Sequence, residues 1–157
     1  MVAGLTIPEK AIVNLIETLQ GITAGATYNR TLEHVRRCED SMQINAYPTV
    51  VVTEIGTDNE LVANPYVFAN INLSLSIFDS GSHSDSWVQR TKLLVADIEH
   101  ALRNTWSRGG NAEMTEVTRS TVFDAPRNSP FVVAECVVRI KTRFLYSDAT
   151  SVAGTVP

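Results

Sequence analysis

The chain has 157 residues, of which 44% are hydrophobic and 19% charged, and its formal net charge at pH 7 is -4. A chain of this length forms one domain and buries about two thirds of its unfolded surface, so it needs no metal or disulfide to fold. The acidic balance argues against a dedicated nucleic-acid binder, and two cysteines are too few for a disulfide scaffold or a zinc site.

The start of the chain has neither the basic residues nor the apolar core of a secretory leader, and no apolar run approaches the ~20 residues of a membrane span. We therefore expect synthesis in a reducing cytoplasm. Cys38 and Cys136 fall in apparent strands, which predicts small buried apolar side chains rather than redox groups.

The first predicted element is a short amphipathic helix. Thr6 followed by Glu9 forms a capping box, Pro8 suits the first turn, and Gly21 ends the helix. Its apolar residues recur at helical spacing: Ile12, Leu15, Ile16 and Leu19.

Three strands are predicted next, at residues 32–38, 49–55 and 66–78. Between the last two, residues 56–65 are rich in Gly, Asp, Asn and Pro. They predict a projecting loop longer than a minimal hairpin turn.

The strand at 66–78 has the clearest pattern in the chain. Large apolar side chains occupy every second position, so one face packs on a core and the other meets water or a partner. The apolar set is Val67, Ala69, Ile71, Leu73, Leu75 and Ile77, and the alternate set includes Asn70, Asn72, Ser74 and Ser76.

A Ser/Gly/Asp loop ending near residue 85 precedes a second and longer helix at about 85–106, which has one apolar stripe. Asp97 and Glu99 are assigned to its solvated side, and residues 108–111 end it with residues that tolerate positive φ. Two further strands follow at 114–123 and 132–146. The second carries Arg139, Lys141 and Arg143 on its outer face.

The order α-β-β-β-α-β-β predicts an α+β fold, a mostly antiparallel sheet with two helices packed on one face. We expect a single domain at 1–146 and a tail or arm at 147–157. The second face of the sheet is left for solvent or a neighbour.

The sequence contains no recognisable phosphate-binding, metal-binding or catalytic motif. The glycine pair at 109–110 follows a helix instead of preceding one, and His34, His83 and His100 lack metal-ligand spacing. A serine nucleophile in the Ser82–His83 loop would have no visible oxyanion donors. We therefore expect no catalytic, cofactor-binding or metal-binding residues, no cofactor, and no enzyme activity.

The row Arg139, Lys141 and Arg143 places cations about 7 Å apart, near the spacing of successive phosphates. The row has no interleaved aromatic residues, and the chain is acidic overall. A solubilising face, or cross-strand pairing with Glu33, Glu113 or Glu116, is therefore favoured over strong nucleic-acid binding.

Several segments together resemble the tail terminator proteins of long-tailed bacteriophages, over most of residues 6–146. They are IVNLIETL at 12–19, YPTVVV at 47–52, the long alternating strand, LVADIEHAL at 94–102 with the Gly109–Gly110 stop, and RFLY at 143–146.

The resemblance implies a virion protein at the tail–neck junction, assembled in the host cytoplasm. Such a subunit closes into a ring, usually a hexamer, that caps the head-proximal end of the tail tube, stops its polymerisation and meets the neck or connector protein. Double-stranded DNA passes through the lumen without specific binding, and no membrane is involved. Two alternatives stay open: a head-closure or other neck ring protein, and a small-molecule-binding α+β domain.

Two groups of candidate residues follow from the ring hypothesis. The inter-subunit or lumen face holds Asn70, Asn72, Ser74, Ser76, Arg139, Lys141 and Arg143. The candidate docking loops hold Thr57, Asp58, Asn59, Glu60, Ser82, His83 and Asp85.

Overall fold

A computed structural model describes residues 4–38, 43–63, 65–80, 87–123 and 131–152. Two helices and six strands lie in these ranges. In chain order they are α1 (Ile7–Gln20), β1 (His34–Arg37), β2 (Thr49–Ala63), β3 (Tyr66–Asp79), α2 (Trp87–Asn104), β4 (Met114–Val122), β5 (Phe131–Leu145) and β6 (Asp148–Val152).

The strands form one sheet in the order β1-β2-β3-β5-β4, and β6 pairs with the end of β5. Among the six described strands, only the short β1 is parallel to its neighbour β2, and the other strand pairings are antiparallel. The α+β fold with a mostly antiparallel sheet is therefore confirmed.

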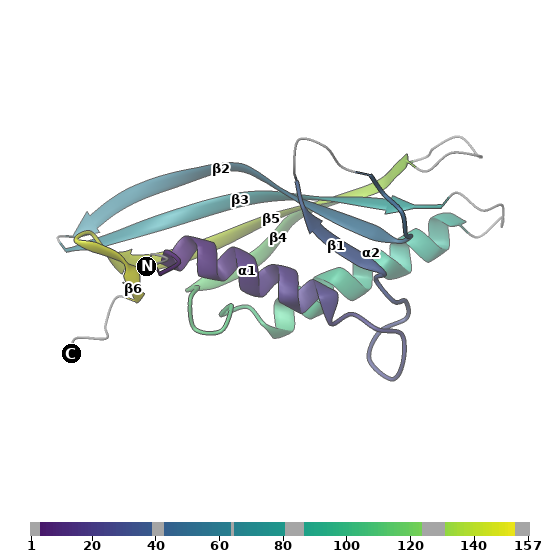
Figure 1. The fold of residues 1–157 in the computed structure, drawn as a ribbon, viewed down its shortest axis with the longest axis horizontal. Helices are drawn as coiled ribbons and strands as arrows, with labels where there is room; N and C mark the ends of the chain where they lie inside the picture. Colours follow the sequence, from purple (N-terminus) through teal and green to yellow (C-terminus); the bar gives the residue numbers. More distant parts are fainter. Residues whose placement is uncertain (1–3, 39–42, 64, 81–86, 124–130, 153–157) are drawn as a thin grey trace.

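Both helices pack on the same face of this sheet, as predicted (Figure 1). The apolar positions of β3 are buried, and they share one hydrophobic core with the apolar stripes of α1 and α2. Leu15 of α1, Leu73 of β3 and Ile98 of α2 have no exposed surface. Burial of side chains of this size stabilises the fold by about 1.5–3 kcal/mol each.

The ends of α1 confirm the predicted caps. Thr6 accepts a hydrogen bond from the backbone N–H of Glu9 at 3.4 Å, and the N–H of Gly21 donates to the carbonyl of Glu17 at 3.2 Å. Glu9 does not complete the predicted capping box in the described contacts, because its carboxylate pairs with Arg37 of β1 instead.

The turn after α2 does more than end the helix. Arg108, Gly109 and Gly110 all have positive φ, of 49°, 67° and 84°. The Arg108 side chain is fully buried and donates to the carbonyl of Leu102 at 2.7 Å and to Thr105 Oγ1 at 2.6 Å. Burial lowers its pKa to about 10, so it stays protonated at neutral pH and caps the carboxyl end of α2.

The predicted loop at 56–65 is wrong, because residues 56–63 continue β2. They pair with β3 from Gly56 opposite Asn72 to Ala63 opposite Tyr66, with irregular register after Glu54. The backbone ladder to β3 outweighs the weak strand propensity of Gly, Asp and Asn. The connection is therefore short, and the β2–β3 hairpin extends beyond the helices (Figure 1).

The predicted tail at 147–157 contains a strand within its described part. β6 turns back along β5, and the carbonyl of Thr150 accepts a hydrogen bond from Lys10 Nζ of α1 at 3.0 Å. This part of the segment is therefore joined to the domain by backbone and side-chain contacts.

Two single-residue predictions need correction. Cys136 is buried as expected, but Cys38 is exposed because β1 ends at Arg37 and the thiol lies beyond the core. Asp97 is 3% exposed rather than solvated. Its carboxylate accepts hydrogen bonds from the backbone N–H groups of Asn29 and Arg30, both at 2.8 Å, and this explains its burial.

Candidate interaction surface

The face of the sheet opposite the helices, here called the open face, gathers all seven residues of the predicted inter-subunit or lumen set. They occupy alternate positions of two neighbouring antiparallel strands, β3 and β5, away from the helix-covered core. The set is Asn70, Asn72, Ser74, Ser76, Arg139, Lys141 and Arg143.

Cross-strand pairing brings several of these side chains together. Asn70 lies opposite Lys141, and Asn72 lies opposite Arg139 with its Oδ1 3.4 Å from the arginine Nε. Ser74 is only 8% exposed because its hydroxyl donates to Glu135 Oε1 of β5 at 2.7 Å. The amides and hydroxyls of β3 are thus partly engaged within the sheet.

The two arginines of this set have carboxylate partners. Arg139 pairs with Glu116 at 3.7 Å, and Arg143 pairs with Glu113 at 3.0 Å. Two of the three partners that the sequence offered for cross-strand pairing are therefore present. Glu33 makes no such pair among the described contacts. All four side chains are 40–49% exposed, so each pair adds only about 0–1 kcal/mol to stability.

Two aromatic rings of β3 contact cations of the basic row. Lys141 Nζ lies 4.2 Å from the centre of the Phe68 ring, and the Arg143 guanidinium lies 5.8 Å from the Tyr66 ring. Such cation–π contacts add about 0.5–1 kcal/mol at exposed sites. Neither contact was predicted from the sequence. Phe68 and Tyr66 occupy the same alternate positions of β3 as Asn70. This alternation could have placed both rings on the face of the basic row.

The four docking residues predicted at 57–60 belong to β2 and are all exposed. Asp58 lies opposite Asn70, and Glu60 lies opposite Phe68, so these two carboxylates extend the open face. Thr57 and Asn59 alternate with them and lie on the other side of the strand. The other three docking residues, Ser82, His83 and Asp85, lie outside the described residues.

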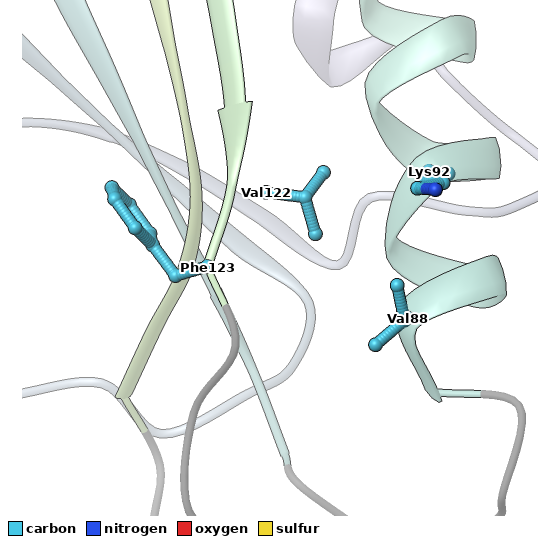
Figure 2. A pocket seen from close by; sticks show the side chains of 4 residues that line it. All are labelled: Val88, Lys92, Val122 and Phe123. Carbon is cyan, nitrogen blue, oxygen red and sulfur yellow. The ribbon is translucent and has the colours of Figure 1, made fainter.

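A shallow cleft of about 350 Å³ lies between the start of α2 and the end of β4. Figure 2 shows Val88 of α2 and Val122 of β4 facing each other across it, and Lys92 and Phe123 complete the lining. Three of these side chains are apolar, and the fourth supplies one ammonium group. The cleft holds no acid–base pair.

Within the described ranges, no group of three or more His, Cys, Asp or Glu side chains is placed to hold a metal ion. Neither of the two helices found there is long and apolar enough to cross a bilayer.

No family model matches the sequence, and a search of the curated proteins finds no match.

Proposed function

We propose that the chain is a structural assembly protein of a bacteriophage virion. In this proposal it acts as a tail terminator that closes into a ring, caps the head-proximal end of the tail tube and stops its polymerisation. The ring joins the tube to the neck or connector protein, and the subunit carries no catalytic centre. The resemblance of sequence and element order supports this function, and the open face is the structural observation that carries it.

The open face suits a passage that DNA crosses without being held. Its arginines are paired with Glu113, Glu116 and Glu135, and its centre carries the amides of Asn70 and Asn72. Strong nonspecific DNA binding depends on unpaired cations that displace counterions from phosphates. With its arginines paired, and Lys141 as the one cation of the set without a carboxylate partner among the described contacts, the face is expected to bind the phosphate backbone weakly, as a conduit requires.

Such a ring can stop tube growth if its two faces differ. One ring face matches the last ring of the tube, and the other face does not match a further tube subunit, so growth stops. A closed ring uses a heterologous interface, in which two different surfaces of each subunit meet. The hairpin of β2 and β3, which extends beyond the helices, is available for contacts between rings (Figure 1).

A small-molecule-binding domain is the rival from another class, and the cleft of Val88, Lys92, Val122 and Phe123 is the observation that favours it. Its apolar lining with one ammonium group fits a small apolar carboxylate. The cleft is shallow, however, and buried ligand sites usually enclose most of their ligand. A head-closure or other neck ring would share the open face and would differ only in its docking partner.

The test is size-exclusion chromatography with light scattering, on the chain alone and mixed with tail tube protein. The terminator hypothesis predicts a ring, or a monomer that forms rings when tubes are added and then remains at one tube end. A monomer that neither binds nor caps tubes would contradict the hypothesis. If a small apolar carboxylate also raised the melting temperature of that monomer, the binding-domain alternative would be favoured.

A further inference from the structure

Residues 54–61, the second half of β2, are unusually exposed to solvent. Every residue from 54 to 61 is exposed, and Ile55 and Leu61 are 60% and 63% exposed. On one side this segment pairs with β3. On its other side, β1 pairs only with residues 49–52, and the last backbone contact is the Cys38 N–H to the Val52 carbonyl at 2.8 Å.

The opposite border of the sheet is also free. β4 pairs with β5 on one side and is the last strand in the sheet order, so no described residue pairs with its outer side. The two free edges are similar in length, residues 54–61 on β2 and Met114–Val122 on β4. Unpaired edges of this length present rows of N–H and C=O groups that readily accept another strand.

We propose that the free edge of β2 in one copy pairs with the free edge of β4 in the next copy, so that the sheet continues from subunit to subunit. Strand direction supports this joint. β2, β3, β5 and β4 alternate in direction across the sheet. In a closed ring whose axis runs roughly along the strands, β4 of one copy and β2 of the next are therefore antiparallel, and the alternation is unbroken.

Charge supports the same joint. The free edge of β2 carries Glu54, Asp58 and Glu60 and no basic residue. Two β2 edges related by a two-fold axis would oppose these like charges, which destabilises strand pairing. β4 offers Arg119, which lies on the open face, as do Asp58 and Glu60. It pairs with Glu135 at 3.4 Å, but its side chain is 68% exposed and therefore open to further carboxylates. Arg119 is thus placed to meet these carboxylates across the joint.

The nearest competitor is a two-fold dimer formed by β4. Two β4 edges could pair about a two-fold axis with Glu116 opposite Arg119, but that dimer leaves the acidic edge of β2 uncovered. Pairing of β2 with β4 covers both edges with one repeated contact. The inference rests on the proposed ring and assigns the surfaces that form it.

The test uses charge reversal in the full chain, with association followed by light scattering across a concentration series. One variant carries Asp58→Lys and Glu60→Lys, and the second carries Arg119→Glu. Each alone is expected to need a concentration about tenfold higher, or more, for half-assembly than the original chain. An equimolar mixture is expected to regain assembly, because each reversed edge then meets a reversed partner.

The matched control is Glu17→Lys, which reverses an exposed carboxylate on α1, outside both edge strands, and is expected to assemble as the original chain does. If a reversed variant loses its circular-dichroism spectrum or melting temperature, Glu60→Gln and Arg119→Gln replace the reversals and are expected to weaken assembly without the rescue.

Three results would overturn the inference: assembly of either reversed variant at the original concentration, a mixture that stays monomeric, or an original chain that stays monomeric at its solubility limit even with tube protein present. Assembly of the β2 variant but not of the Arg119→Glu variant would identify the two-fold β4 dimer instead. Rings that cap tubes despite reversed edges would refute this joint and leave the proposed function standing. If the edges pair as proposed but the chain has no effect on tube growth, the proposed function would be refuted and this joint would stand.

Discussion

Asp97 is a buried carboxylate that fixes a loop to a helix. It accepts three hydrogen bonds of 2.8 Å, from the backbone N–H groups of Asn29 and Arg30 and from the Asn29 side-chain amide. Hydrogen bonds to a charged group are stronger than neutral ones, and removal of Asp97 leaves three donors at a partly buried site without their acceptor.

We therefore expect Asp97→Ala to lower the free energy of unfolding by about 2–3 kcal/mol, measured by urea denaturation. Glu17→Ala removes an exposed carboxylate from α1 and serves as the control, with little change expected. Equal stability of the two variants would show that the Asp97 contacts do not hold the loop.

The two cysteines differ in burial and hence in reactivity. Burial raises the pKa of the Cys136 thiol to about 11, whereas Cys38 is exposed. Because the thiolate is the reactive form, Cys136 stays protonated and inert through pH 9. A thiol reagent at pH 8 is expected to label one cysteine in the folded chain and both after denaturation. Rapid labelling of both in the folded chain would contradict the core position of Cys136.

Sequence reasoning failed at single residues where a partner far along the chain decides the outcome. The helical position of Asp97 gave no sign of the two backbone donors that approach it from residues 29 and 30. Arg108 was assigned only to a turn, but its guanidinium also donates to Thr18 Oγ1 of α1 at 3.3 Å, 90 positions earlier in the chain. Such contacts exist only after the elements have packed.

Helices and strands were more predictable, because their periodicity reflects which side is buried. The alternation in β3 gave the strand, its buried face and the residues that share the open face with β5. The distal part of β2 was missed because Gly56, Asp58 and Asn59 resemble a turn in composition. Its pairing to β3 is a non-local effect that composition does not record.

The turn after α2 provides a test of backbone conformation. Gly109 and Gly110 have φ of 67° and 84°, where a side chain adds about 1–2 kcal/mol of strain. A Cβ on Gly109 would also lie 3.3 Å from Asn14 Nδ2, whereas one on Gly110 would meet no atom within 4 Å.

Gly109→Ala is therefore expected to destabilise the chain more than Gly110→Ala, and both more than a change at the exposed Gly4, which has no such φ. Chemical denaturation of the three variants measures the order. A Gly110→Ala variant less stable than Gly109→Ala would contradict the described contact with Asn14.

The paired charges of the open face matter for assembly more than for folding. Each pair is about half exposed, so Arg139→Glu with Arg143→Glu is expected to lower the free energy of unfolding by only about 1–2 kcal/mol. In the proposed ring, however, the same change concentrates negative charge along the DNA path or the subunit contact. We expect phage titre to fall, and to recover when Glu113→Arg and Glu116→Arg restore the balance.

The most direct measurement is negative-stain imaging of the particles made by a phage strain that lacks this chain. A tail terminator that caps the tube predicts overlong tails or tails without heads, and particles of normal length once the chain is supplied again. Intact virions with tails of normal length in the absence of the chain would contradict the proposed function.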